Sequence, residues 1–580
     1  MRTASDAAAT HGPEKGSVAS PKSGARWSLE LVGLALLVVF GAVIRAHGFT
    51  SFDLWFDDAW AAAPARASIS QAIHMGLTAP GYTLLIRSWI RIDPAATWWA
   101  QTPAFILGLL AIPAVWALLR WFRWPRWIAI GGAVVVAAGP LLVQYSTRVK
   151  EYPFDLLACC LLLFLAERFR RDRTSADLAW LAAASVAGVF CSASCATAVV
   201  GVWLAVAVMA AAHRALWPRF AIWAGVTGAG LLAVYALFLR KIPSVLNHNW
   251  RNRGYLVDYR SHVAFERTVT MVLGGFIHAF IGYPVPHDFF GAAGGLHAAS
   301  VAIIGLLVLA VAIGVPVLAS VRSRSVDAAL PAALVLCVAG ILVVLDLVPL
   351  GDGRTDEVLY PALLVCLGSI AAMLDARVRP AVSASSARRA TAVGAAVAVL
   401  AAALTFGAFH RAQYPTLNLR GLAQRLAPLE RPGDVVFVDT FNSFAWCYYG
   451  LSPCRFQVGG LPVWPQGFRP VSTSPDAFIA SHYGIPLPEL TAAQAGARRI
   501  WYVGYTYGTY DVGGNPLFAD FPTSTYMTGL LHLEGWHPAT PSAKATTFLG
   551  GLHVYAQLYV RDAKLPGTPA TAPDSSSHRA

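Results

Sequence analysis

Two adjacent carboxylates with aromatic neighbours follow the first apolar run of the chain. Asp57 and Asp58 lie in the sequence Trp-Phe-Asp-Asp-Ala-Trp, residues 55–60. Paired carboxylates beside aromatic rings at a membrane interface suit a general base, a divalent metal site or both. The residues support a structural alternative equally well. Either aspartate could cap a helix that continues through the following alanines, with the tryptophans as interface anchors.

A basic segment between two later apolar runs is the second candidate. It contains Arg148, Lys150 and Glu151, and the charge pattern of the chain places it on the outer face. The positive-inside rule disfavours Arg and Lys on that face, and cations placed against the rule often bind a phosphate. The alternative is that Arg148 and Lys150 snorkel to the interface and pair with Glu151.

Two further outer segments carry groups that could bind an anion or a sugar. Gly351 and Gly353 permit a tight turn that could bring Arg354 close to a bound anion, although a simple polar turn is equally well supported. The longer segment 241–297 contains Arg and His donors for a sugar or phosphate, without a metal-ligand spacing.

The C-terminal part of the chain contains two cysteines around a Gly/Pro turn, Cys447 and Cys454. Outside the cell a disulfide is favoured over a metal site, so the pattern predicts a disulfide between them. The remaining six cysteines lie in apolar runs, where they are expected as small core residues.

The elements that position these groups must be surrounded by lipid. The chain has 580 residues, of which 56% are hydrophobic and 13% charged, about half the charge density of a soluble protein. Its net charge of +13 falls mostly in short connections between apolar runs. A nucleic-acid-binding protein would gather that charge in one surface patch, so no nucleic-acid partner is expected.

The apolar runs predict a mostly α, polytopic helical bundle with about eleven transmembrane helices. They lie near residues 28–46, 101–119, 127–145, 154–167, 176–192, 196–212, 219–239, 298–320, 328–349, 359–375 and 390–409. Arginine-rich connections recur on one side of these runs, which marks that side as cytoplasmic. With an odd number of spans, the C-terminal part of the chain lies outside.

Four regions follow from this pattern. Residues 1–27 are rich in Ala, Ser, Gly and Pro and are predicted to be a disordered cytoplasmic N-terminus. Residues 28–410 form the transmembrane domain, with an outer loop at 47–100 of interfacial amphipathic helices. Residues 411–564 alternate strand-like and helical runs, which predicts an extracytoplasmic α/β domain. Residues 565–580 are predicted to be a disordered tail.

The order of these motifs resembles the GT-C superfamily of polyprenyl-phosphate-sugar-dependent glycosyltransferases. The similar members are bacterial enzymes related to family 39 protein mannosyltransferases and to the aminoarabinose and Rgt-type transferases. Those enzymes have an Asp-Glu motif after Trp or Tyr in the first outer loop. Asp57 matches the Asp, and Asp58 replaces the Glu. Three further elements are similar, and they lie at Ala79 to Tyr82, at Arg148 to Tyr152 and at Gly353, Arg354, Tyr360 and Pro361.

The resemblance covers about 28–410 and implies a sugar transfer, with inversion, from a polyprenyl-phosphate donor to an extracytoplasmic acceptor of the cell envelope: a glycan, a lipid or a protein. It implies a multi-pass protein of the plasma (inner) membrane. It makes Asp57, with Asp58, the proton acceptor. Arg148, Lys150, Tyr152 and Arg354 are assigned to the donor phosphate. Some relatives use a divalent metal, which Asp57 and Asp58 permit but do not require.

Two other classes of function remain open from the sequence. A transporter or flippase of lipid-linked intermediates would place ionisable residues inside its spans, where the sequence offers few besides Asp346 near a span end. A non-catalytic envelope assembly factor would need the C-terminal domain while Asp57 and Arg148 would be dispensable.

Overall fold

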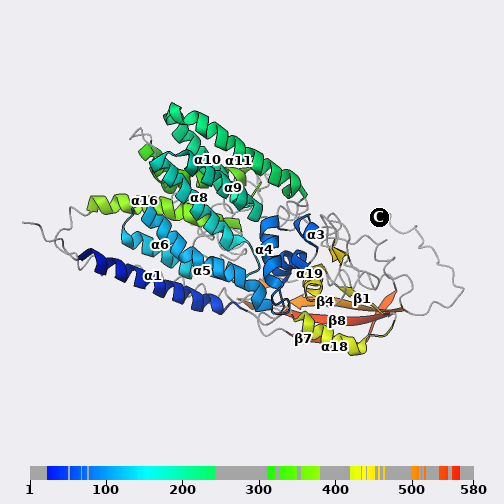
Figure 1. Cartoon of the computed structure of the whole chain (residues 1–580). Coiled ribbons are helices and arrows are strands. Elements are labelled where there is room, and N and C mark those ends of the chain that lie inside the picture. Colours follow the sequence, from blue (N-terminus) through cyan, green and yellow to red (C-terminus); the bar gives the residue numbers. More distant parts are fainter. Residues whose placement is uncertain are drawn as a thin grey trace, which may run out of the picture.

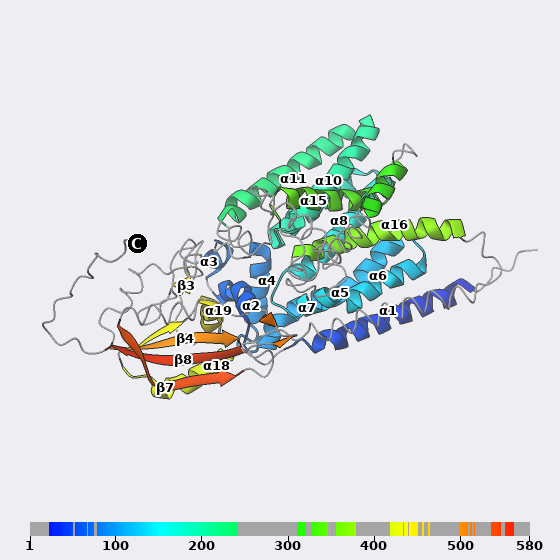
Figure 2. The ribbon, with the colours of Figure 1, turned by 180° about the vertical axis from the view of Figure 1, so that it is seen from behind.

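The computed structural model has a bundle of long helices at one end and a small sheet with its own helices at the other (Figures 1 and 2). The structure describes residues 22–49, 53–66, 68–74, 78–241, 310–320, 327–345, 347–348, 355–378, 418–432, 434–438, 440–450, 455–456, 462–463, 498–507, 511–512, 515–516, 535–546 and 552–561. Some side chains within these ranges, among them that of Asp57, are outside the description.

The apolar runs form the helices of the bundle, because a segment in lipid must satisfy its backbone hydrogen bonds internally. The long helices are α1 (Lys22–Ala46), α5 (Thr97–Trp121), α6 (Arg126–Ala138), α8 (Tyr152–Asp172), α9 (Ser175–Cys191), α10 (Cys195–Ala212), α11 (Trp217–Leu237), α15 (Leu330–Val344) and α16 (Tyr360–Val378). Short 3-10 turns lie at η2 (Arg214–Leu216), η3 (Leu239–Lys241) and η5 (Thr355–Leu359). Helix α1 begins before residue 28, so part of the predicted disordered N-terminus is helical.

Ten of the eleven predicted spans overlap with helices, and the last, at 390–409, lies outside the described residues. One prediction needs correction. The run at 127–145 is divided at Gly139, because the residue before a proline is pushed into extended backbone; a short helix, α7 (Pro140–Tyr145), follows. By length and composition, four helices of the described chain could cross a membrane: Thr97–Trp121, Cys195–Ala212, Arg214–Leu237 and Glu357–Leu374. The count of eleven spans stays a prediction.

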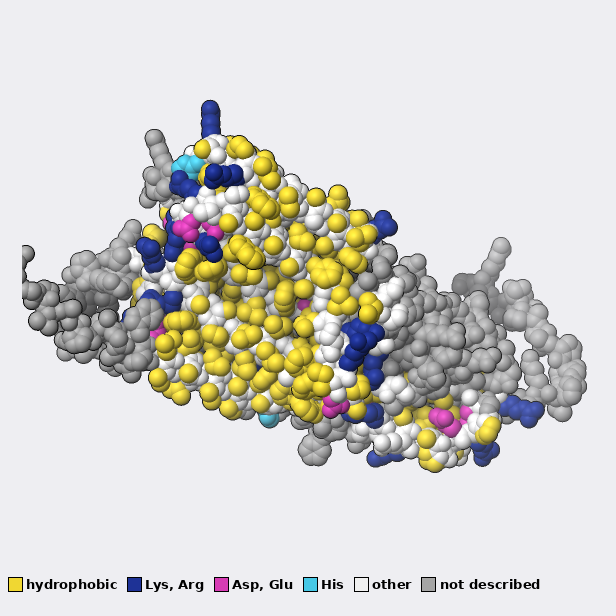
Figure 3. Space-filling model, in the orientation of Figure 1, with side chains coloured by type: hydrophobic (Ala, Val, Ile, Leu, Met, Phe, Trp, Pro, Cys, Tyr) yellow, Lys and Arg dark blue, Asp and Glu magenta, His cyan; other side chains and the backbone are white. Residues whose placement is uncertain are grey.

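The exposed sides of the helices in the bundle are apolar. Figure 3 shows hydrophobic side chains over the middle of the helical part, with Lys and Arg towards its ends. Leu36 on α1 and Leu232 on α11 are 65% and 66% exposed. Such a surface is stable only against lipid, and the chain is a membrane protein. Inside, the helices approach closely at small residues. A Cβ on Gly201 of α10 would lie 2.4 Å from Cα of Val335 of α15.

The C-terminal part forms a mixed four-stranded sheet in the order β1-β4-β8-β7. Strand β1 (Val435–Val438) is parallel to β4 (Arg499–Tyr507), whereas β4 with β8 (Leu552–Arg561) and β8 with β7 (Trp536–Thr546) are antiparallel. Helix α18 (Leu419–Leu426), η7 (Ala427–Leu429) and α19 (Thr440–Tyr448) accompany the sheet, and β2 (Arg455–Phe456), β3 (Pro462–Val463), β5 (Asp511–Val512) and β6 (Asn515–Pro516) form two small ladders. The predicted α/β architecture is confirmed.

The outer segment between α1 and α5 shares one hydrophobic core with this sheet domain. The segment forms α2 (Phe56–Ala62), η1 (Ala63–Arg66), α3 (Ile69–His74) and α4 (Pro80–Ile90). Leu54 and Trp60 belong to the same buried cluster as Leu422, Phe444 and Trp501. This core therefore contains residues from both sides of the predicted domain boundary at 410/411.

Candidate active site

Asp58 and Arg148 form a buried ion pair between the outer segment and the connection from α7 to α8. Nη1 of Arg148 lies 3.1 Å from Oδ2 of Asp58, and the backbone N–H of Val149 donates to Oδ1 at 3.0 Å. The Arg148 and Asp58 side chains are 6% and 2% exposed. The structure thus brings two predicted site residues into direct contact, and both oxygens of Asp58 accept a hydrogen bond.

This geometry argues against a helix-capping role for Asp58. The N-cap residue of α2 is Trp55, and no side chain caps the helix there. Asp58 lies in the first turn of α2 and reaches across to Val149 and Arg148, so it links two segments and does not cap its own helix. Arg148 pairs with Asp58, where the sequence had offered Glu151 as an alternative partner.

The segment that carries Arg148 is itself held by buried hydrogen bonds. Arg45, near the end of α1, donates to the carbonyls of Val136 and Ala137 at 2.7 Å and to Oγ of Ser146 at 3.1 Å. A cation at the C-terminal end of α6 satisfies its last carbonyls and opposes the negative end of the helix dipole. Gln101 donates to the carbonyl of Thr147 at 2.6 Å. Arg148 is therefore presented from a rigid turn.

Sequence reasoning missed Arg45. The available signal was a cation at the predicted outer end of an apolar run, against the positive-inside rule.

Lys150 and Tyr152 follow Arg148 at the start of α8. Lys150 is partly exposed, whereas Tyr152 is buried and packs edge-on against Tyr145 with ring centroids 5.1 Å apart. Between them, Oε2 of Glu151 is buried and has no hydrogen-bond partner in the described part of the chain. A polar atom buried in this way costs free energy unless a ligand or another group satisfies it.

Tyr82, in the predicted Ala-Pro-Gly-Tyr element, lies in the first turn of α4 and is 1% exposed. Its hydroxyl also has no hydrogen-bond partner among the residues described. Burial raises the pKa of Tyr82 well above its usual value, and the negative charges of Glu151, Asp58 and Asp155 act in the same direction. Tyr82 and these three carboxylates therefore lie near one another at the end of the bundle that meets the sheet domain.

Asp155 is a second residue that sequence reasoning missed. It lies one turn into α8, is fully buried, and accepts a hydrogen bond from Sγ of Cys195 at 3.4 Å. A carboxylate at the start of the apolar run 154–167 was the signal that could have identified it.

Several of the predicted site features are outside the described residues, including Gly351, Gly353 and the segment 242–297. They also include the side chain of Asp57, Arg354, and the predicted disulfide between Cys447 and Cys454. The backbone of Asp57 lies in α2 beside Asp58, and η5, which follows Arg354, packs against α8. No three His, Cys, Asp or Glu side chains gather in a metal-binding group within the described ranges, and Asp58 already has two partners. Because the side chain of Asp57 is outside the described residues, a metal held by Asp57 and Asp58 stays a prediction.

No family model and no curated protein matches the chain. Among solved structures, ArnT from Cupriavidus metallidurans in the apo state aligns over 92% of this chain and 98% of its own, with 14% identity and a TM-score of 0.51. The chain has the fold of ArnT. The same protein bound to undecaprenyl phosphate aligns over the same shares with 13% identity and a TM-score of 0.48. The archaeal oligosaccharyltransferase AglB from Archaeoglobus fulgidus aligns over 83% of this chain and 70% of its own, with 13% identity and a TM-score of 0.48.

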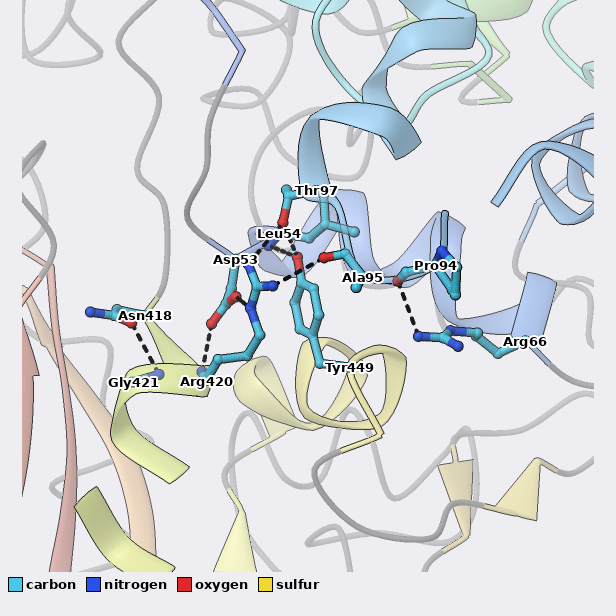
Figure 4. Close-up of polar contacts among 10 residues, drawn as sticks. All are labelled: Asp53, Leu54, Arg66, Pro94, Ala95, Thr97, Asn418, Arg420, Gly421 and Tyr449. Atoms are coloured by element: carbon cyan, nitrogen blue, oxygen red, sulfur yellow. Dashed lines mark hydrogen bonds and ion pairs between the residues drawn. The ribbon is translucent and has the colours of Figure 1, made fainter. Parts of the chain in front are cut away.

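This ArnT-like fold brings the sheet domain into contact with the segment that leads to Asp58 (Figure 4). Asp53 is 2% exposed and accepts from the backbone N–H of Arg420 at 2.7 Å and from Nε of the same arginine. Burial raises the pKa of Asp53, and the bonds from Arg420 oppose that shift. Sequence reasoning missed both residues, because nothing in the chain marks a pair separated by 367 positions.

Proposed function

We propose that this protein is a membrane glycosyltransferase that moves a sugar from a polyprenyl-phosphate donor to an acceptor of the cell envelope. The observation that carries the proposal is the buried ion pair of Arg148 with Asp58, in a GT-C fold, at the end of the bundle that the sheet domain covers. The pair brings the acidic and the basic segment together. A reaction in which a phosphate is the leaving group needs both a proton acceptor and a cation near the reacting atoms.

The chemistry is assigned to the residues as follows. The acceptor hydroxyl attacks the anomeric carbon, the bond from that carbon to the phosphate oxygen breaks, and the configuration is inverted. The phosphate leaves with the bonding electrons, and Arg148, Lys150, Tyr152 and Arg354 stabilise its charge. Asp57 accepts the hydroxyl proton. Because both oxygens of Asp58 are engaged, we assign Asp58 to holding Arg148 and Val149 in place.

The donor class is supported by the fold. ArnT, which this chain resembles at a TM-score of 0.51, has also been solved with undecaprenyl phosphate. We propose a lipid phosphate of this class as the carrier. We further propose that the protein lies in the plasma (inner) membrane with its N-terminus cytoplasmic. The arginine-rich connections, such as Arg168 to Arg173, support this orientation because the sheet domain lies at the opposite end of the bundle.

The test is sugar transfer by the purified protein from labelled polyprenyl-phosphate monosaccharides to a crude cell-envelope acceptor. Asp57→Asn and Arg148→Ala are compared with the control Asp93→Asn. Asp93 lies in the same outer segment, where its Oδ1 accepts from the N–H groups of Ala95 and Ala96, a role that asparagine can keep. Folding of each variant is checked independently by thermal unfolding.

Transfer by the wild type and by Asp93→Asn, lost in folded Asp57→Asn, supports the transferase and the assigned base. Transfer that survives both Asp57→Asn and Arg148→Ala removes these residues from the mechanism. Absence of transfer with every donor favours the two alternatives. A flippase is then recognised by movement of the intact lipid donor across a vesicle membrane. An assembly factor is recognised by loss of function when the sheet domain is altered and Asp57 is not.

A further inference from the structure

We propose that Arg420 and Tyr449, two residues of the sheet domain, are positioning residues for the acidic motif on α2. The inference rests on the proposed transferase function for its kinetic part. It adds that the geometry of Asp57 and Asp58 depends on how the C-terminal domain is seated on the bundle.

Arg420 connects three points of the membrane domain. Its backbone N–H and its Nε donate to the two oxygens of Asp53, which lies just before α2. Its Nη1 donates to the carbonyl of Ala95 at 3.0 Å, and its Nη2 to Oγ1 of Thr97, the first residue of α5, at 3.3 Å. Figure 4 shows the guanidinium between these groups. A planar guanidinium can hold several acceptors at once in a fixed geometry, which a lysine cannot.

Tyr449 makes the second connection, at the end of α19. Its hydroxyl accepts from the backbone N–H of Leu54 at 2.8 Å and bonds Oγ1 of Thr97 at 2.7 Å. The guanidinium of Arg420 lies over its ring, 4.5 Å from the centroid. The two side chains therefore support each other and fix Asp53 and Leu54 relative to the beginning of α5.

This connection reaches Asp58 through a short helix. Helix α2 begins two positions after Leu54 and has seven residues. A helix of this length is too short to be stable alone. The sheet domain holds its beginning through Asp53 and Leu54, and its far end through Trp60, whose ring packs 4.9 Å from that of Phe444 on α19. Asp58 lies between these two attachments and bonds Arg148 and Val149. A shift of the sheet domain therefore moves both acidic residues.

The test compares two adjacent tyrosines in the full-length protein. Tyr449→Phe keeps the ring and removes the hydroxyl that bonds Leu54 and Thr97. Tyr448→Phe is the matched control, because its hydroxyl is buried without a hydrogen-bond partner among the described residues. Arg420→Ala is compared in the same way with Arg425→Ala, an exposed arginine further along α18.

We expect Tyr449→Phe and Arg420→Ala to lower kcat by roughly 10- to 100-fold, the effect of a small displacement of a catalytic group. The KM for the lipid donor should stay within about two-fold of the wild type, because Arg45 and Gln101 hold the turn that carries Arg148 independently of the sheet domain. A loss of folded protein alone would lower the active fraction and would appear in thermal unfolding. Equal kcat in Tyr449→Phe and Tyr448→Phe would overturn the proposal.

Hydrogen exchange gives a second measurement that does not depend on transfer. We expect faster exchange at residues 55–62 and at the amide of Val149, which donates to Asp58, in Tyr449→Phe but not in Tyr448→Phe. This result supports the positioning role even if no donor is found. Unchanged exchange at these amides, or faster exchange spread through the strands of the sheet domain, would overturn it.

Discussion

Arg148 and Asp58 are 90 residues apart in sequence and form one buried ion pair between two outer segments of the bundle. Removing one member of a buried pair leaves an uncompensated charge and costs about 3–5 kcal/mol. We therefore expect Arg148→Ala to lower the free energy of unfolding by that amount. The double variant Arg148→Ala/Asp58→Asn should regain part of the stability.

The same pair of variants separates stability from catalysis. If Arg148 stabilises the leaving phosphate, the double variant stays inactive although it is folded. Thermal unfolding in detergent and a transfer assay on the same preparations measure both quantities. Transfer restored in the double variant would mean that Arg148 serves only to neutralise Asp58.

A pH effect is expected at Asp53. Burial holds the pKa of Asp53 above its ordinary 3.8, and Arg420 opposes that shift. In Arg420→Ala this opposition is lost, so the pKa rises further. A carboxyl whose pKa is raised by folding stabilises the fold below the ordinary value, and this contribution is lost as the pH rises through the folded-state value. The free energy of unfolding of Arg420→Ala should therefore fall more steeply than that of the wild type from about pH 4 upwards.

The control for this effect is Arg420→Ala/Asp53→Asn, which has no carboxyl to titrate at this position. Its stability should fall less steeply with pH than that of the wild type or of Arg420→Ala, because the raised pKa of Asp53 contributes a slope in both of those proteins. Chemical unfolding of the full-length protein between pH 4 and pH 7 measures the slopes. Parallel curves for all three proteins would show that Arg420 does not determine the protonation of Asp53.

Tyr82→Phe is expected to separate stability from activity in a different way. An unsatisfied buried hydroxyl costs about 1–3 kcal/mol, so its removal should leave the protein equally stable or more stable. If the hydroxyl bonds the donor or the acceptor, transfer should fall about 10- to 100-fold. The melting temperature and kcat of Tyr82→Phe measure these effects. A destabilised variant with unchanged kcat would show that Tyr82 has only a packing role.

Two glycines test the helix packing of the bundle. A Cβ at Gly201 would meet the backbone of Val335 at 2.4 Å, whereas one at Gly225 of α11 has no described atom within 4 Å. Alanine gains about 1 kcal/mol of helix propensity at both positions, but overpacking costs about 1–3 kcal/mol at Gly201 alone. We expect a lower melting temperature for Gly201→Ala and an equal or higher one for Gly225→Ala. Equal shifts in the two variants would contradict the close approach of α10 and α15.

The sequence predicted the helices of the bundle well, because the length of an apolar run can be read from neighbouring residues alone. The runs at 101–119 and 196–212 became α5 and α10 with boundaries close to those expected. Pro140 was a signal for the helix break at Gly139. The break was not predicted, because the apolar run continues on both sides of it. The sequence also singled out Asp58 and Arg148, because each departs from the pattern of its surroundings, and the structure brings the two into contact.

The partners of the residues that the sequence missed could not be predicted, because these contacts join segments that are far apart in the chain. Arg45 is one of many arginines near a helix end, and only the fold shows that it binds the end of α6. Tyr449 and Arg420 lie in a region without strong periodicity, and their partners lie more than 300 positions earlier. Side chains of this kind acquire a role from the arrangement of elements, which a linear pattern does not contain.

The core shared by the outer segment and the sheet domain also has a consequence for biosynthesis. Leu54 and its partner Tyr449 are 395 residues apart, which takes roughly 20–80 seconds to synthesise at the usual rate. During that time α2 lacks Phe444, Tyr449 and Arg420, although the first helices are already in the membrane. The contacts that hold α2 therefore form only after Tyr449 has been made, and until then the acidic motif lacks its attachment to the sheet domain.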